Sequence, residues 1–270
     1  MIKSQLKVIS MVSCLLLLAT GLSSAGLTIT GGNINKEFAP GDHLSQIIKV
    51  QIADSDQPMD FRVDVLGWGQ TVGAPYVQLS PDKDTSTFTA RPLLNVSPES
   101  FHLDPGKSTE LKVEGDIPKD ASSGGRYALI KIVTLPKGNG TVRLSMGALN
   151  LVNLTISGSG ITRKAAIENL SLEEPISARQ QNLSLVFTNI GNIAYIPKIT
   201  AMIKDKEGNV AANSTMPSQY VLLPTFSRLN QLRITPMTPL SPGTYNVNAT
   251  VSLSDGTILA TKETTFEVKS

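Results

Sequence analysis

Apolar and polar residues alternate with a period of two along most of this chain. The clearest alternation covers residues 59–65, where Met, Phe and Val at odd positions are separated by Asp and Arg at even ones. The same period recurs over residues 48–52, 183–187, 199–203 and 245–251. This period is typical of half-buried strands, and no segment beyond residue 25 has a helical period of 3.6. The pattern predicts an all-β fold.

A weak repeat divides the chain into two parts. Gly125-Arg126-Tyr127 and Gly243-Thr244-Tyr245 each open a late apolar strand. This arrangement is typical of the tyrosine corner of immunoglobulin-like sandwiches, in which the ring is buried and its hydroxyl bonds the backbone near the preceding corner. We predict two tandem immunoglobulin-like β-sandwich domains after a signal peptide. Their expected bounds are 26–158 and 163–270, with a flexible linker at 159–162.

Residues 1–25 have the layout of a secretory signal peptide. Lys3 and Lys7 precede an apolar run over residues 8–19, and Ser23-Ser24-Ala25 supplies a small-residue cleavage site. The run of about 12 residues is shorter than the ~20 that a membrane-spanning helix needs. We expect cleavage after Ala25 and a secreted or cell-surface protein with no membrane span in its mature part. The single cysteine, Cys14, lies inside the leader, so the mature chain has no disulfide.

Net charge and the reactive residue types argue against several classes of function. The chain has 24 basic and 22 acidic residues, and the leader holds two of the basic ones and no acid, which leaves the mature part near neutrality. Net charge therefore indicates no nucleic-acid partner. The two histidines, His43 and His102, stand apart in the sequence, and no nucleophile motif accompanies them. Asp54-Ser55-Asp56 and Asp82-Lys83-Asp84 have the composition of turns rather than of complete calcium loops. We expect no enzyme and no cofactor.

Several segments resemble known families. The first half contains Val96-Ser97-Pro98, Leu103, Pro105-Gly106, Pro118 and an apolar strand after Tyr127. It resembles the first domain of PapD-type pilus chaperones and the N-terminal domain of WxL-interacting proteins. The second half contains residues 187–192, 205–208, 222–224 and 242–245, and it resembles the second WxL-interacting domain and a cell-adhesion-related bacterial domain. The resemblance covers most of the mature chain, and it implies two immunoglobulin-like domains that bind another protein.

The segment 142–156 is the most informative for binding. Its even positions form a nearly continuous apolar face, while the odd positions begin polar and then include Leu149 and Leu151. An exposed strand with two apolar faces is unusual, because it invites pairing with another chain. Either the second domain or the strand that follows the signal peptide covers these leucines, or they receive a strand of a partner by β-augmentation. Pilus chaperones also hold their client's C-terminus with a basic pair. The resemblance implies that Arg143 could stand in for one member, and residues 27–30 contain no arginine for the other.

Two further features are candidates for surface contacts. Trp68 lies between two glycines just past a strand, which fits a core position or an aromatic displayed to a partner. Asn-x-Ser/Thr sequons occur at Asn95, Asn139, Asn153, Asn169, Asn182, Asn213 and Asn248. Composition alone predicts about three of them. In a host with N-glycosylation the protein is expected to be a glycoprotein, and in other hosts the sequons reflect polar strands and turns.

Two functional hypotheses remain from the sequence. In the first, the protein is a secreted or cell-surface binding and scaffold protein, with a role in adhesion, that engages a protein or a cell-envelope polymer through its sandwich surfaces. In the second, it is an extracytoplasmic PapD-like assembly chaperone that uses strand 142–156 for β-augmentation. The first predicts that the edge of this strand is covered. The second predicts a bent two-domain cleft with the edge exposed and a basic group beside it.

Overall fold

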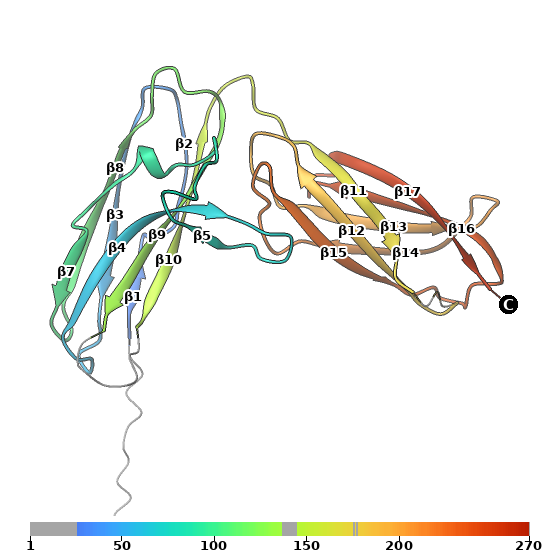
Figure 1. Cartoon of the computed structure of the whole chain (residues 1–270), viewed down its shortest axis with the longest axis horizontal. Coiled ribbons are helices and arrows are strands. Elements are labelled where there is room, and N and C mark those ends of the chain that lie inside the picture. The colour runs from blue at the N-terminus through green and yellow to red at the C-terminus, as the bar shows by residue number, and fades with distance from the viewer. Residues whose placement is uncertain (1–25, 137–144, 175, 177, 270) are drawn as a thin grey trace, which may run out of the picture.

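The computed structural model describes residues 26–136, 145–174, 176 and 178–269. It shows two immunoglobulin-like β-sandwiches in tandem, arranged as the two arms of a bent molecule (Figure 1). The predicted signal peptide lies outside the described residues, as do Asn139 and Arg143. Within the described ranges no helix is long and apolar enough to cross a membrane. The all-β prediction is confirmed.

The first sandwich consists of a four-stranded sheet, β1-β3-β8-β6, and a six-stranded sheet, β2-β10-β9-β4-β5, in which β7 also pairs with β4. A 3₁₀ turn, η1, spans Arg91–Leu93. The strands are β1 (Thr28–Thr30), β2 (Ile34–Phe38), β3 (His43–Gln51), β4 (Met59–Gly69), β5 (Val77–Leu79), β6 (Asn95–Ser97), β7 (Ser100–Leu103), β8 (Ser108–Asp116), β9 (Gly124–Leu135) and β10 (Gly147–Ile156).

The second sandwich packs a three-stranded sheet, β11-β12-β15, against a four-stranded sheet, β14-β13-β16-β17. The chain passes from β10 into β11 through the short connection 157–164. The strands are β11 (Ala165–Leu172), β12 (Gln181–Asn189), β13 (Lys198–Lys204), β14 (Val210–Pro217), β15 (Ser227–Ile234), β16 (Gly243–Ser252) and β17 (Ile258–Val268).

Each sandwich has its own core, built from the inward phase of its strands. In β4 the apolar residues Phe61 and Val63 are buried between the exposed or half-buried polar ones. Phe187 and Val247 occupy the corresponding core of the second sandwich. Burying one such side chain contributes roughly 1.5–3 kcal/mol, so the alternation in sequence decides which face of each strand turns inward.

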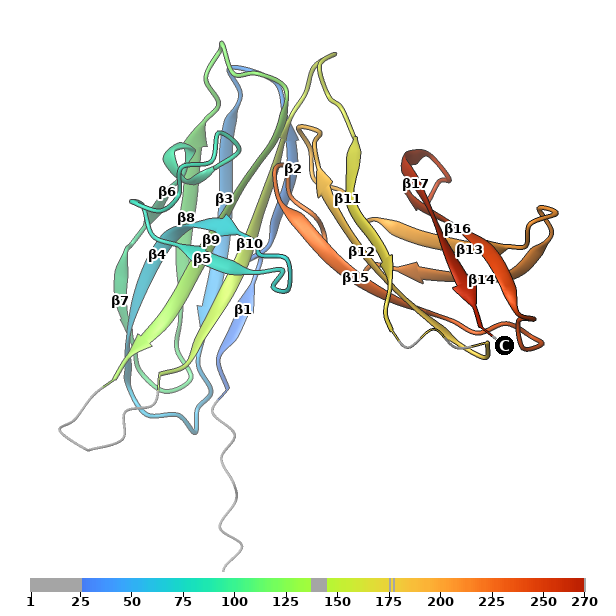
Figure 2. The same ribbon diagram turned by 45° about the vertical axis from the view of Figure 1, so that its right-hand side comes forward.

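A third, smaller cluster joins the two sandwiches. Trp68, Tyr127 and Leu129 of the first sandwich pack with Leu223 of the second, and Leu151 lies against them. The hairpin of β4 and β5 reaches toward β15 in both views, so the first sandwich touches the second at more than the connecting segment (Figure 2). This cluster fixes where the cleft between the arms begins.

Candidate functional site

Strand β10 lies near the edge of the six-stranded sheet and is only partly covered. It pairs with β9 over its whole length, from Gly147 to Ile156. On its other side β2 runs parallel to it, but only from Val152 onward. Among the described residues no strand pairs with that side of Gly147–Leu151. The N-terminal half of β10 is therefore an open edge of the sheet.

The open edge exists because the N-terminal strand changes sheets. β1 pairs with β3 in the opposite sheet, whereas β2 joins β10, and Gly31-Gly32-Asn33 makes the crossing. A Cβ on Gly32 would lie only 1.9 Å from Oδ1 of Asn150, so the crossing needs a residue without a side chain. This contact also explains the polar break in the apolar face of β10. Asn150 is buried beneath the crossing and donates to the carbonyl oxygen of Ile130 at 3.1 Å.

The backbone of the open edge points outward at alternate residues. The amide of Leu151 donates to Oδ1 of Asn33 at 2.9 Å, away from β9. Because both polar groups of one strand residue point to the same side in an antiparallel pair, Gly147 and Leu149 also direct their N–H and C=O away from β9. The side chain of Leu149 is 37% exposed. The edge thus offers two donors, two acceptors and an apolar side chain.

Leu151 differs from Leu149 because the second sandwich partly covers it. Its side chain is half-buried, packs against the junction cluster and lines a cleft of about 690 Å³. Trp68 and Asn153 line the same cleft from the first sandwich, and Ala194 and Ile196 line it from the second. Ile196 is 56% exposed. The cleft therefore adjoins the open edge and has an apolar wall at Leu151 and Ile196 within a lining that also contains polar residues.

Trp68 is a buried residue of the junction. It is 5% exposed, its indole N–H donates to the carbonyl oxygen of Pro75 at 3.1 Å, and its ring stacks on Tyr76 at 5.6 Å. The aromatic that the sequence allowed as a residue displayed to a partner is thus buried and lines the cleft. Flanking glycines alone do not distinguish these positions, because the covering side chains come from distant segments.

Tyr127 corrects one expectation from the sequence. Its ring is buried, as predicted, but its hydroxyl accepts a hydrogen bond from the backbone N–H of Ala194 in the second sandwich at 2.6 Å. Tyr245 does form the expected corner, with its hydroxyl donating to the carbonyl oxygen of Ser241 at 3.0 Å. Gly125 is required in the first motif, because a Cβ there would lie 1.7 Å from the Tyr127 hydroxyl oxygen. The repeated motif therefore serves two different contacts.

Further hydrogen bonds link the two sandwiches. Gln70 is buried, its amide nitrogen donates to the carbonyl oxygen of Val221 at 2.9 Å, and its Oε1 accepts from the N–H of Leu223 at 2.9 Å. The N–H of Gly125 donates to the carbonyl oxygen of Asn192 at 2.8 Å. Sequence reasoning missed these residues, because nothing in a lone Gln or Asn reveals that its partner lies in another domain.

The cleft also contains charged groups that sequence reasoning missed. Arg163, in the connection between the sandwiches, and Asp255, in the turn between β16 and β17, both line it. Hydrogen bonds from Thr257 chiefly lower the pKa of the Asp255 carboxyl, and the charge of Arg163 lowers it further. Arg163 thus places a cation in the cleft from a position that the resemblance to pilus chaperones did not indicate.

The sequons of the described residues lie in different environments. Asn95, Asn169, Asn182 and Asn213 are exposed, whereas Asn248 and Asn153 are half-buried. The amide nitrogen of Asn248 donates to Glu263, and that of Asn153 donates to Asn35 beside the cleft. A glycan on either of these two would replace a hydrogen bond that the fold already makes.

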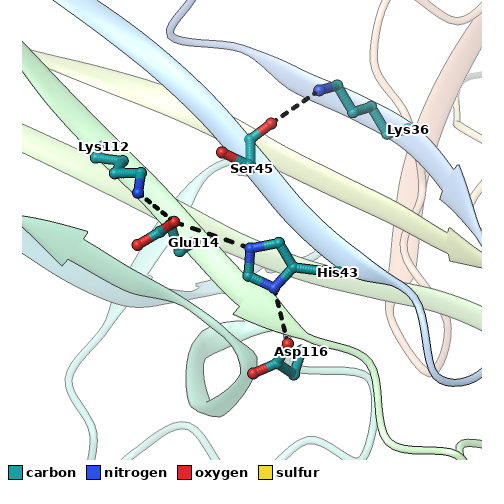
Figure 3. Close-up of polar contacts among 6 residues, drawn as sticks. All are labelled: Lys36, His43, Ser45, Lys112, Glu114 and Asp116. Atoms are coloured by element: carbon teal, nitrogen blue, oxygen red, sulfur yellow. Dashed lines mark hydrogen bonds and ion pairs between the residues drawn. The ribbon is translucent and has the colours of Figure 1, made fainter.

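The histidines lie on the surface of the first sandwich, away from the cleft. His43 places Nδ1 2.8 Å from Asp116 and Nε2 3.8 Å from Glu114, which also pairs with Lys112 (Figure 3). In the same view Lys36 donates to the backbone carbonyl of Ser45. His102 pairs with Asp60 at 2.6 Å in a separate exposed position. These are contacts on the exposed surface, and in the exposed ion pair of Lys112 and Glu114 the contribution is about 0–1 kcal/mol.

One acid of each candidate calcium turn has structural partners. Oδ2 of Asp56 accepts the N–H of Ala53 at 2.9 Å and that of Gly26 at 3.2 Å. Oδ2 of Asp84 accepts from the hydroxyl of Thr89 and from Arg91. The described part of the chain contains no cluster of three or more potential metal ligands.

No protein-family model matches the sequence, and no curated protein matches it. Among solved structures, the chain is similar to the class 5 fimbriae chaperone CfaA at 13% identity, covering 90% of this chain and 99% of that one with a TM-score of 0.42. It is similar to the E. coli chaperone DraB at 15% identity, with coverages of 91% and 98% and a TM-score of 0.36. It is also similar to a structure of the Salmonella enterica SafA pilin in complex with the SafB chaperone, at 12% identity, with coverages of 90% and 99% and a TM-score of 0.35.

Proposed function

We propose that this protein is an extracytoplasmic, non-enzymatic binding protein that captures an extended segment of another polypeptide along the open edge of β10. The observation that carries the proposal is the uncovered half of this strand, where Gly147 and Leu149 face outward beside an exposed apolar side chain. Such an edge is a template for one more strand. The signal peptide predicted for residues 1–25 supports export.

An incoming strand would find both kinds of contact that β-augmentation uses. Its backbone would bond the outward groups of Gly147 and Leu149. Its alternate side chains would point toward Leu149 and into the cleft beside Leu151 and Ile196. Main-chain bonds would supply affinity, and the apolar wall at Leu151 and Ile196 would supply preference for apolar side chains.

The geometry favours strand capture over a scaffold that uses only its outer surfaces. The scaffold hypothesis expects a covered edge, and the second sandwich covers Leu151 but leaves Leu149 accessible. The capture hypothesis expects a bent two-domain cleft with a basic group, and the structure has Arg163 in that place. An assembly chaperone for an exported client is therefore the form of binding protein that we propose.

The edge can be blocked without touching the core. In Leu149→Pro the missing N–H is one that points away from β9, so the native pairing is retained. Peptides would first be selected from a random library on the wild-type protein, and their affinity then measured on the variant. Loss of the backbone bond and of the leucine contact is expected to cost about 2 kcal/mol, or roughly 30-fold in affinity.

Two controls complete the experiment. Ile47→Asp changes an apolar residue of similar exposure, 43%, on β3, and is expected to bind like wild type. The backbone nitrogens of the selected peptide would also be methylated, at odd positions in one peptide and at even positions in another. Only the peptide whose methyl groups replace the N–H groups that bond β10 is expected to lose binding. Equal affinity of wild type and Leu149→Pro, with both proteins folded, would rule out capture at this edge.

A further inference from the structure

Strand β15 carries two polar residues where its core-facing phase should be apolar. Arg228, Asn230, Leu232 and Ile234 all point inward, and the two aliphatic members belong to the core of the second sandwich. Arg228 and Asn230 are each only 7% exposed. Polar residues at core positions are costly unless their hydrogen bonds are satisfied, so their presence at this end of the strand indicates a special use.

The buried guanidinium of Arg228 has only neutral partners. It donates to the hydroxyl of Ser218 at 3.4 Å and to the carbonyl oxygens of Tyr220 at 3.1 Å and Val221 at 3.3 Å. No carboxylate among the described residues pairs with it. The amide nitrogen of Asn230 is buried without any partner. Within the described fold, no negative charge therefore pairs with the Arg228 guanidinium at this end of β15, and no acceptor bonds the side-chain amide of Asn230.

Both residues line a pocket of about 350 Å³ at the junction of the sandwiches. The β4–β5 loop contributes Val72 and Pro75, and the segment 216–220, which includes the polar residues Ser218 and Gln219, forms another part of the wall. The N–H of Leu229 donates to the carbonyl oxygen of Val72 at 3.1 Å, which fixes the loop over the second sandwich. The rim is apolar and accessible, since Val72, Tyr220 and Leu229 are 40–44% exposed.

We propose that this pocket is a second binding site, which accepts an acidic side chain of a partner polypeptide next to an apolar one. A carboxylate would supply the negative charge that Arg228 lacks and would accept the free amide proton of Asn230. The apolar neighbour would pack on Val72 and Leu229 at the rim. Charge complementarity and the accessible apolar rim together define an acidic–apolar peptide motif as the occupant.

The arrangement of the aromatic rings disfavours a saccharide. Sugars are held chiefly by free aromatic faces, but Arg228 lies 5.9 Å over the Tyr220 ring and Tyr76 contacts that ring edge-on at 6.0 Å. A face of Tyr76 stacks on Trp68. The Tyr220 ring that lines the pocket thus already contacts Arg228 and Tyr76, whereas the aliphatic side chains of Val72 and Leu229 are accessible.

The test uses an array of short peptides, each with a central Asp or Glu flanked by Leu, Val or Phe, and each paired with its Asn or Gln counterpart. The wild-type protein is expected to bind the best acidic peptide at least tenfold more tightly than its amide pair. Arg228→Gln should abolish this discrimination. Arg233→Gln, on the exposed face of the same strand, is the matched control and should retain it.

A second variant guards against misfolding of Arg228→Gln. Asn230→Asp places a carboxylate inside the pocket, so it should retain or raise the melting temperature while abolishing binding of the acidic peptide. The edge variant Leu149→Pro should bind that peptide like wild type, which separates this site from strand capture. Equal binding of acidic and amide peptides, or binding of acidic oligosaccharides with no acidic peptide bound, would overturn the proposal.

Discussion

Replacing Tyr127 by Phe removes a single oxygen from the junction of the two arms. The hydroxyl accepts the N–H of Ala194 across the junction at 2.6 Å, and no other change to the packing is needed. The ring keeps its edge contact with Trp68 at 6.2 Å. The substitution therefore isolates one hydrogen bond that links the sandwiches.

The expected loss at neutral pH is about 1–3 kcal/mol in the free energy of unfolding, because Ala194 is left without its acceptor in a partly buried place. The stability at alkaline pH provides a second test of this hydroxyl. Burial raises the pKa of Tyr127 to about 12, although the bond from Ala194 and the charges of Arg126 and Arg163 act in the opposite direction. In the unfolded chain the phenol has its ordinary pKa of 10.0.

The direction in which stability changes with pH follows from proton linkage. Below pH 10 the phenol is neutral in both states and its stabilisation is fully present. Between pH 10 and about pH 12 the unfolded chain releases the proton while the folded protein keeps it, so stability falls by up to roughly 1.4 kcal/mol per pH unit. The Tyr127→Phe variant has no phenol proton to lose at this position. The advantage of wild type over Tyr127→Phe should therefore shrink as the pH rises through this window.

Urea unfolding of both proteins at pH 8 and pH 11 measures this difference. Tyr195 also has a pKa raised by burial, but it is present in both proteins and cancels in the comparison. Small-angle scattering at pH 8 is expected to show a wider distribution of interdomain angles for the variant. An equal stability of the two proteins at pH 8, or a gap that does not change at pH 11, would contradict the role assigned to this hydroxyl.

Four further outcomes are expected. Leu151→Asp should lower the melting temperature, with a loss of several kcal/mol, because it puts a charge against the junction cluster, whereas Leu149→Asp should melt like wild type; equal melts would contradict the difference in burial. Gly32→Ala should destabilise by several kcal/mol, and Asn150→Ala should restore part of the loss, as urea unfolding of the double variant would show. Tyr245→Phe should cost about 1 kcal/mol, measured by thermal unfolding, since one hydrogen bond to Ser241 is lost. N-terminal sequencing of the exported protein should begin at Gly26. Because this cleavage would create an ammonium group beside the Asp56 carboxylate, Asp56→Asn should destabilise the processed form more than the precursor.

The fold class followed from the sequence because strand periodicity is a local property. The alternation over residues 59–65 and 245–251 determined which side chains turn inward, since burial of each apolar residue depends little on which strand covers it. The Tyr245 corner was also predictable, because its partner Ser241 lies four residues away. A contact of this kind forms within a short segment of the chain, so it does not depend on how distant segments pack.

The tertiary structure alone decided how the two sandwiches meet and what remains open. Tyr127 has the same local motif as Tyr245, yet it bonds Ala194, 67 residues further along the chain. Leu149 and Leu151 look alike in sequence, but only the second lies under the other sandwich. Arg228 lies on the inward-facing side of β15, and sequence reasoning did not single it out as a binding residue. Such features depend on the register between strands and on the angle between domains, which are set by the sum of many weak contacts between residues far apart in the chain.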